Sequence, residues 1–192
     1  MDIPDDVIAR RDLKRNKLFN FALQVQGLFS KFVLAILLWS SWALYYSDLG
    51  QIIIGKVLIT VICIGLGVIA PLIDLNQSHA TNPLWTGHAR FHLVWQVSAF
   101  IYTAVFNIPL LWLNSNISMQ LVAIVFVYMW LITFLIAYFT MSVYNGRLND
   151  INGVPENIYI IVGKVFIVDR NLEAVVAMTL VTTFATYLII SG

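Results

Sequence analysis

Charged residues and cysteines are scarce in this chain of 192 residues. Asp, Glu, Lys and Arg together make up 11% of it, and the single cysteine, Cys63, lies within an apolar run. A typical soluble domain has about 25% charged residues, so the composition excludes a soluble globular domain and a disordered chain. One cysteine forms no intramolecular disulfide, and a net charge of +1 offers no basic surface for a nucleic acid.

Several motifs of catalysis and cofactor binding are missing from the sequence. It has no phosphate-binding glycine loop and no dinucleotide fingerprint, so we expect neither a nucleotide nor a flavin. It also has no Gly-x-Ser-x-Gly nucleophile elbow. With 3 histidines, the chain has too few ligands for a membrane di-iron oxygenase. His88 and His92 would project from the same side of one helix, so we expect no haem between them.

Long apolar runs dominate the sequence instead. Hydrophobic residues make up 60% of the chain and the mean hydropathy is +0.84. A helix that crosses the hydrocarbon core needs about 20 mostly apolar residues. Five segments approach this length: 27–46, 52–73, 93–113, 119–144 and the more polar 172–191. The sequence predicts an all-α fold, a polytopic transmembrane helix bundle of about five spans, with an interfacial helix as the alternative for the fifth.

The basic residues indicate how the chain is oriented. Five of them precede the first predicted span: Arg10, Arg11, Lys14, Arg15 and Lys17. Because positive residues stay on the cytoplasmic side, we expect a cytoplasmic amino terminus in a bacterial inner membrane, surrounded by membrane lipids. The chain then divides into a basic amphipathic amino-terminal segment, residues 1–26, and a transmembrane helix bundle, residues 27–192. Within the second span, Gly65 and Gly67 are expected to allow close approach of another helix.

All three histidines fall in one short region, residues 74–92, between the second and third predicted spans. Asn82 followed by Pro83 is typical of a helix start, so we expect the third helix to begin there. An α-helix completes one turn in about 3.6 residues, which places several polar side chains on one edge of this helix. That edge consists of His88, His92, Gln96, Thr103 and Asn107.

Asp74 ends the second predicted helix at the same membrane surface where the third begins. The fourth connection, with Arg147 and Asp150, emerges there as well. Ionisable side chains in a membrane protein face protein or water rather than lipid. We therefore interpret this convergence as a polar site at the cytoplasmic ends of helices two to four, which binds or processes a hydrophobic or amphipathic small molecule.

Each residue of this site has an expected role. His88 and His92 are the candidate catalytic residues, and Asp74 would orient them, because an imidazole beside a carboxylate exchanges protons near neutral pH. The expected ligand-binding residues are one aromatic side chain, two guanidinium groups and two further polar groups: Trp85, Arg90, Gln96, Arg147 and Asp150. The arginines would hold an anionic group, and Trp85 would pack on the apolar part of the ligand.

The same region also offers nitrogen and oxygen ligands for a metal ion. The candidate ligands are His79, His88, His92 and Asp74. Ala89 stands where the zinc-protease helix has its general-base glutamate, which argues against a metalloprotease. A metal ion at this set is the cofactor that the sequence leaves open.

Two other classes of function compete with the ligand site. Histidine, tryptophan and arginine are frequent at membrane interfaces, and Asp74 could simply pair with Arg90 or Arg147. The protein would then be a non-catalytic accessory or scaffold subunit, or an assembly factor, with membrane-protein partners or further copies of itself. A transporter or channel is the other alternative, although the spans show no inverted repeat.

The string Asn-Pro-Leu-Trp-Thr-Gly-His-Ala-Arg-Phe-His at residues 82–92 is distinctive in an apolar sequence. It resembles a signature, N-P-x-W-x-x-H-A-R-F-H, of small multi-spanning membrane proteins without an assigned activity. The resemblance covers about a tenth of the chain. It implies a similar helix bundle and a shared site at this loop, and it implies no reaction.

Overall fold

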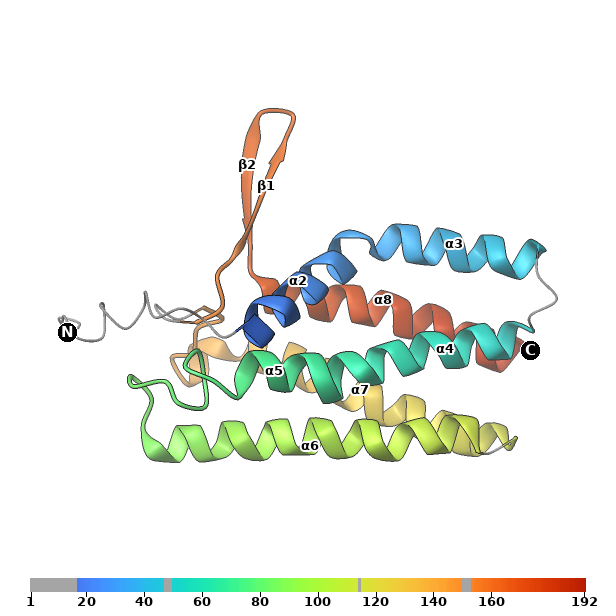
Figure 1. Ribbon diagram of the computed structural model, residues 1–192, viewed down its shortest axis with the longest axis horizontal. Helices are drawn as coiled ribbons and strands as arrows, with labels where there is room; N and C mark the ends of the chain where they lie inside the picture. Colours follow the sequence, from blue (N-terminus) through green and yellow to red (C-terminus); the bar gives the residue numbers. More distant parts are fainter. Residues whose placement is uncertain (1–16, 47–49, 114, 150–152) are drawn as a thin grey trace.

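The computed structural model describes residues 17–46, 50–113, 115–149 and 153–192. Long helices lie side by side, and one small hairpin projects from them (Figure 1). The helices are α2 (Lys17–Lys31), α3 (Val33–Tyr46), α4 (Gln51–Ile64), α5 (Ala70–Asp74), α6 (Gly87–Trp112), α7 (Ile117–Phe139) and α8 (Arg170–Ser191). A π-helical turn, η1 (Gly65–Ile69), joins α4 to α5, and a 3-10 turn, η2 (Met141–Val143), follows α7. The hairpin consists of β1 (Asn157–Ile161) and β2 (Lys164–Val168).

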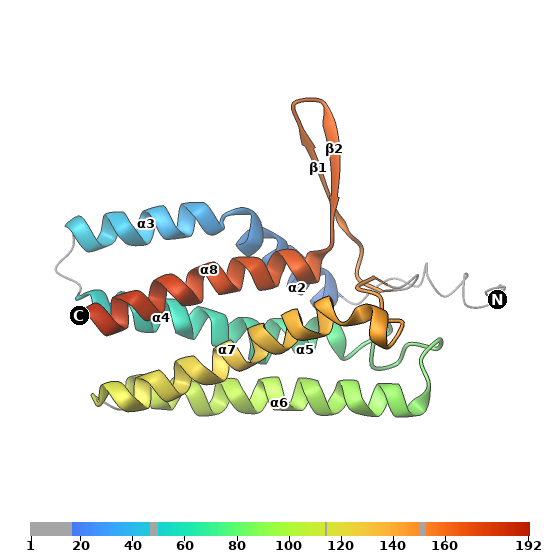
Figure 2. The ribbon, with the colours of Figure 1, turned by 180° about the vertical axis from the view of Figure 1, so that it is seen from behind.

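The prediction of an all-α polytopic transmembrane bundle is confirmed. Within the described residues, 4 helical stretches are long and apolar enough to cross a membrane: Gln51–Asp74, Gly87–Trp112, Ile117–Phe139 and Arg170–Ser191. The last of these is α8, which contacts α2, α3, α4 and α7. Figure 2 shows it running between α3 and α7, as a member of the bundle. The fifth predicted segment is therefore a candidate span that packs within the bundle, and the interfacial alternative stays a prediction.

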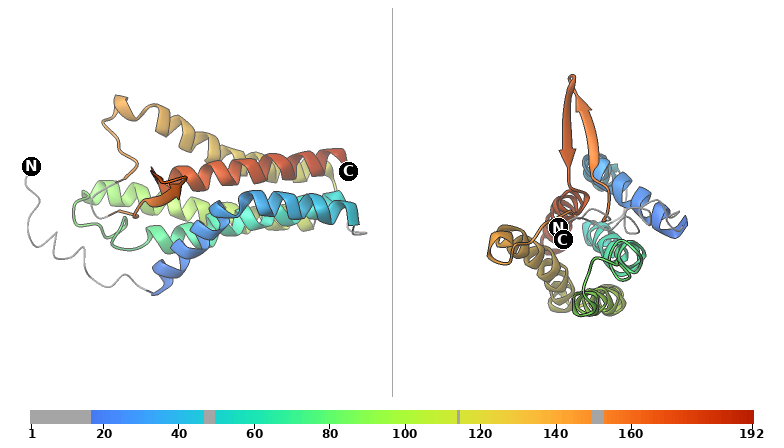
Figure 3. Two further views of the ribbon diagram at one scale, coloured as in Figure 1. Left: turned by 90° about the horizontal axis from the view of Figure 1, so that it is seen from above. Right: turned by 90° about the vertical axis from the view of Figure 1, so that its left-hand side faces the viewer.

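The first predicted span, residues 27–46, is not one straight helix. It comprises the end of α2 and all of α3, and the two helices meet at an angle of 62° (Figure 3). Both helices contact α8, but α2 also packs on α5 and η1, with Ile73 and Val154 at its buried side, whereas α3 also contacts α4. The pair therefore makes at most one broken span. The predicted division at residue 26 falls inside α2 and stays a prediction, and residues 1–16 lie outside the described part of the chain.

The third span begins later than predicted. Its helix, α6, starts at Gly87, where the Thr86 side chain caps it by accepting a hydrogen bond from the Ala89 N–H at 3.2 Å. Asn82 lies fully buried in the preceding loop, where its Oδ1 accepts from the Leu84 N–H at 3.0 Å. Asn82 thus closes an Asx turn instead of capping the helix. The two uses of asparagine look alike in sequence because both place a side-chain oxygen over a nearby N–H.

The hairpin is a feature that the sequence analysis missed, since residues 157–168 were expected to form a loop. Its antiparallel register runs from Asn157 opposite Val168 to Ile161 opposite Lys164. The turn residues Val162 and Gly163 have φ angles of 50° and 73°, as the tight turns of two-residue hairpins require. Two runs of β-branched and aromatic residues around a central glycine were the available signal.

The helices pack through a core that is filled by aliphatic side chains. Buried members come from α4, α6, α7 and α8, and include Ile59, Ile62, Leu111, Ala123, Val127, Val181 and Ala185. Gly67 permits the close contact between η1 and α6, because a Cβ atom there would lie 2.3 Å from the Ala104 Cβ. A Cβ on Gly65 would meet nothing within 4 Å. Of the two glycines expected to allow close approach, only Gly67 does so.

Replacing Gly67 should therefore separate the packing role of a glycine from its helix propensity. We expect Gly67→Ala to destabilise the protein by about 1–3 kcal/mol, because the added methyl group forces η1 and α6 apart. Thermal unfolding in detergent measures the effect. Gly65→Ala is the matched control and should be neutral or slightly stabilising, by up to about 1 kcal/mol. Equal stability of the two variants would contradict the close approach.

Candidate functional site

His88 and His92 form a direct pair at the start of α6. Their Nε2 atoms lie 3.0 Å apart and their ring centroids 4.5 Å apart, with the rings nearly perpendicular. At this distance the Nε2–H of one neutral imidazole donates to the Nε2 of the other. Both side chains are exposed on the outside of the bundle. The polar edge predicted for this helix thus begins with two histidines that are hydrogen-bonded to each other.

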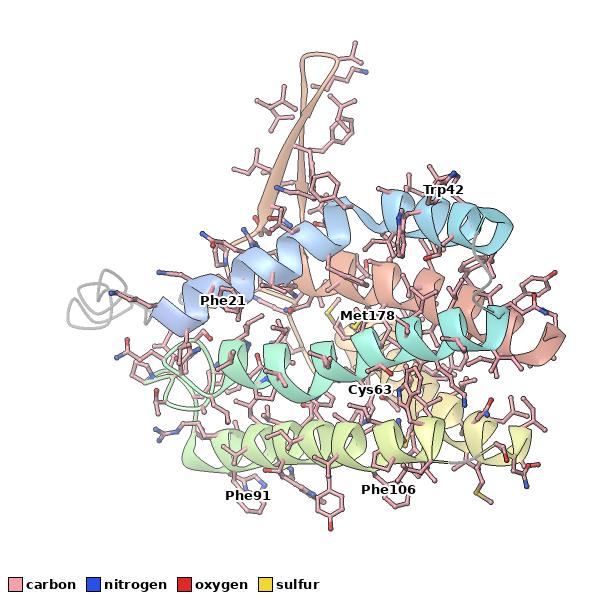
Figure 4. All side chains as sticks on the ribbon, turned by 45° about the vertical axis from the view of Figure 1, so that its right-hand side comes forward. Phe21, Trp42, Cys63, Phe91, Phe106 and Met178 are labelled. Carbon is pink, nitrogen blue, oxygen red and sulfur yellow. The ribbon has the colours of Figure 1, made fainter. Side chains whose placement is uncertain are left out.

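Aromatic side chains surround the histidine pair. Phe91 and Trp95 are 62% and 63% exposed, and their ring centroids lie 5.7 and 5.9 Å from that of His92. An open groove of about 400 Å³ follows, lined by Phe91, Val94, Trp95 and Ser98. Figure 4 shows Phe91 and Phe106 pointing away from the other helices. We call this surface the outer face of α6 and define it by His88, Phe91, His92, Trp95, Tyr102 and Phe106.

A second polar cluster lies in the loop between α5 and α6. The Nδ1 atom of His79 lies 3.5 Å from the Asp74 Oδ1 and 2.8 Å from the Ser78 Oγ. The Ser78 hydroxyl also lies 2.9 Å from the carbonyl oxygen of Ile73, to which it donates. Trp85 meets the His79 ring edge-on, with centroids 5.3 Å apart. Asp74 and Ser78 approach the same imidazole nitrogen of His79. In a catalytic triad, the carboxylate and the hydroxyl contact the two different ring nitrogens of the histidine. The contacts therefore favour a structural role for this cluster.

The structure therefore arranges the four predicted metal ligands as two pairs. Asp74 contacts His79, and His88 contacts His92. In the described part of the chain, no group of three or more His, Cys, Asp or Glu residues is placed to hold a metal ion. The four-ligand set is not assembled, because His79 belongs to the loop and the other two histidines to the outside of α6. For the same reason, Asp74 is positioned to orient His79 and not the pair.

The remaining predicted site residues do not converge on one point either. Arg90 lies two residues from each histidine of the pair and so about 200° around the helix, on the opposite side of α6. Gln96 is exposed and continues the edge of the pair one turn deeper. Arg147 is exposed in the connection after η2, and Asp150 lies outside the described residues. The expected single site is thus divided between the loop and the outer face of α6.

Deeper polar residues of α6 serve the bundle itself. Asn107 is fully buried and donates through Nδ2 to the Ala123 carbonyl oxygen of α7 at 3.1 Å. Thr103 accepts from the Trp130 indole N–H at 3.0 Å, which joins the same two helices. Similarly, Trp112 of α6 donates to Thr60 of α4 at 2.9 Å. The deep half of the predicted polar edge therefore faces neighbouring helices.

A third polar cluster, unforeseen from the sequence, lies at the foot of the hairpin. The Glu173 carboxylate of α8 accepts hydrogen bonds from Asn157 Nδ2, at 2.7 Å, and from the Tyr159 hydroxyl. Burial, and then the Glu173 carboxylate, raise the pKa of Tyr159 to about 12, because both disfavour the ionised phenol. Lys31 Nζ lies 5.6 Å from the centre of the Tyr159 ring. We call Asn157, Tyr159 and Glu173 the hairpin latch.

The hairpin latch could not be found from local sequence patterns. Its partners are 14 and 16 residues apart and meet only after β1 pairs with β2. Glu173 sits in the first turn of α8, where an acidic residue is expected for the helix dipole alone. The neighbouring Arg170 donates to the Leu23 carbonyl oxygen of α2 at 3.2 Å, a contact across 147 residues.

Comparison with known proteins does not assign a function to these clusters. Comparisons with protein-family models, with curated proteins and with solved structures found no match for this chain. The assignment of function therefore rests on the contacts described above.

Replacing the Tyr159 hydroxyl should measure the strength of the hairpin latch. We expect Tyr159→Phe to destabilise the protein by about 1.5–3 kcal/mol, the usual range for a hydrogen bond to a charged group. Thermal unfolding measures the difference. Because its pKa is raised, the Tyr159 phenol keeps its proton in the folded state. The stability difference between the wild type and Tyr159→Phe should therefore be constant below pH 10 and shrink as the pH rises towards 12.

Tyr102→Phe is the control, since Tyr102 is 78% exposed on the outer face of α6. It should leave the stability unchanged at every pH. If both variants unfold like the wild type, the latch does not stabilise the fold.

Proposed function

We propose that this multi-pass membrane protein binds an amphipathic small molecule on the outer face of α6, next to the cytoplasmic surface. The head group would meet His88 and His92, and the apolar part would lie along Phe91 and Trp95. The observation that supports this proposal is the histidine pair, with 3.0 Å between its Nε2 atoms, beside an open aromatic groove.

The length of α6 supports a lipid head group at the level of His88 and His92 along the membrane normal. Its 26 residues extend over about 39 Å, whereas the hydrocarbon core is about 30 Å thick. Part of α6 therefore extends beyond the hydrocarbon, and the polar residues of its first turns, His88, Arg90 and His92, favour that end. Exposed imidazoles are costly among acyl chains but not among head groups, where water and phosphate groups are at hand.

The hydrogen-bonding capacity of the pair indicates which head groups fit. Each ring uses its Nε2 atom within the pair, which leaves its Nδ1 atom for another partner. When both rings are neutral, one Nδ1 carries a proton and the other a lone pair, so the pair offers one donor and one acceptor. A hydroxyl group or a protonated acid group satisfies both, whereas a quaternary ammonium group satisfies neither.

The groove beside the pair suits the apolar part of such a molecule. Its volume of about 400 Å³ lies within the range of ligand pockets, about 300–1,000 Å³. Phe91 and Trp95 present flat apolar surfaces there. An aromatic side chain that becomes fully buried removes about 150–250 Å² of its surface from contact with water.

The proposal covers binding and assigns no chemical step. Asp74, expected to orient the two histidines, contacts His79 instead. Arg90 lies on the opposite side of α6 from the pair. An accessory or scaffold role remains the second candidate, because the outer face continues with Tyr102 and Phe106, 78% and 52% exposed, far beyond the groove. That length fits a partner helix as well as a lipid.

The test is lipid binding by variants of the outer face. We expect the double variant His88→Ala, His92→Ala to bind lysophosphatidic acid roughly tenfold more weakly, because the loss of one good hydrogen bond costs about 1.4 kcal/mol. Phe91→Ala should weaken binding as well. Native mass spectrometry in mild detergent measures the bound lipid and shows which lipids co-purify.

Phe139→Ala is the matched control, because Phe139 is 76% exposed at the end of α7 and outside the groove. It should bind the lipid like the wild type. Unchanged binding by the histidine variant would contradict the proposal. A stoichiometric protein partner that the Tyr102→Ala variant loses would favour the scaffold role instead.

A further inference from the structure

The hairpin of β1 and β2 stands apart from the helices. In Figure 1 and in the end-on view of Figure 3, it extends away from the bundle and across the helix axes. Among the described residues, the hairpin latch holds the foot of the hairpin on α8. The rest of the hairpin has two accessible faces, so the chemistry of its side chains indicates which environment suits it.

One face of the hairpin is entirely aliphatic. Side chains of paired residues point to the same face of a sheet, and alternate pairs share that face. The pairs Ile158–Ile167 and Ile160–Val165 therefore form one surface. Their exposures are 67%, 62%, 74% and 63% in that order. A two-stranded hairpin is marginally stable in water, and a continuous exposed apolar surface marks an interaction site.

The attachment of the hairpin indicates the height at which it lies. β2 ends at Val168, and α8, a candidate span, begins at Arg170. On the other side, Lys31 at the bend between α2 and α3 lies over the Tyr159 ring. The hairpin thus leaves the bundle at the level where spans begin. Because it runs across the helix axes there, its direction is along the membrane surface and not into the water.

The charges near the hairpin favour lipid head groups as neighbours. Lys164 lies at the turn, Lys31 beside Tyr159, and Arg170 at the foot. Asp169 caps α8 and Glu173 is held by the latch, which leaves Glu156 as the exposed acidic residue before β1. Basic residues flanking an apolar surface are typical of segments that bind anionic membranes.

We propose that the hairpin is an interfacial membrane anchor that inserts into the leaflet where α8 begins. Ile158, Ile160, Val165 and Ile167 contact acyl chains, and Lys164 and Lys31 reach the phosphate groups. The hairpin latch fixes the direction in which the hairpin leaves α8. This inference stands independently of the ligand proposed for α6.

Site-directed spin labelling of the full chain tests this inference. The chain has 1 cysteine, so a Cys63→Ala background permits a single nitroxide at residue 158, 160, 165 or 167. The protein is placed in vesicles of phosphatidylcholine and phosphatidylglycerol. Oxygen concentrates in the bilayer, whereas a water-soluble nickel complex stays in the water. We expect every hairpin label to collide more often with oxygen than with the nickel complex.

Two reference positions calibrate this measurement. A label at Leu180, which is 46% exposed in the middle of α8, reports the lipid environment. A label at Gln77, exposed in the loop between α5 and α6, reports water. Hairpin labels that behave like Leu180 support the anchor, and labels that behave like Gln77 overturn it. Four sites are labelled one at a time, so a variant that fails to fold does not decide the outcome.

The same labels distinguish the membrane from a protein partner. If hairpins of two copies paired through their free edges, the labels would lie close together and show spin–spin broadening that unlabelled protein dilutes. Such broadening, with little oxygen preference, would overturn the anchor in favour of a dimer. As a second variant, Lys164→Glu should reduce the oxygen preference in the anionic vesicles and leave it unchanged in phosphatidylcholine alone. An equal effect in both would contradict an attraction of Lys164 to anionic head groups.

Discussion

Hydrocarbon supplies no hydrogen-bonding partner, and this constraint decides where each polar group of the protein lies. Hydroxyl groups within the spans donate to carbonyl oxygens of their own helices, as Thr179 does to Val175 and Thr186 to Thr182, both at 2.7 Å. Indole N–H groups find threonine hydroxyls on neighbouring helices, and Asn107 finds the Ala123 carbonyl oxygen. These contacts join α6 to α7, in a region where apolar attraction between helices is weak.

Other polar groups gather at the end where α6 and α8 begin. They form three separate clusters: the loop around His79, the pair of His88 and His92, and the hairpin latch. The loop around His79 closes the end of α5, and the hairpin latch fixes the hairpin on α8, so both clusters stabilise the fold. In the described part of the chain, the side chains of His88 and His92 hydrogen-bond only to each other, and they lie on the outside of the bundle. This difference is why the ligand is assigned to the pair.

Composition was sufficient to predict the class of fold, because a run of about 20 apolar residues has few alternatives to a membrane helix. The details that failed depend on contacts between distant residues. Gly65 and Gly67 look equivalent in sequence, yet only Gly67 meets Ala104 of α6. Asp74 looked like a partner for the histidines of α6, but the turn at residues 76–79 brings His79 to it first. After Lys31 the chain turns from α5 and η1, which α2 contacts, towards α4, which α3 contacts, while both helices stay against α8.

The packing of the bundle also explains why both proposals concern its outside. Its centre is filled by large side chains such as Ile59, Leu131 and Leu188, each 2% exposed or less. A ligand there would have to displace close-packed aliphatic groups, which costs far more than occupying a surface groove. The inner side of α6, with Val97, Ala104 and Leu111 buried, completes the core, while its outer side keeps large aromatic groups that the fold does not need. The hairpin repeats this arrangement, since its foot serves the fold and its aliphatic face does not. In a small bundle whose centre is filled by large side chains, surfaces that packing leaves unused are the ones available for function.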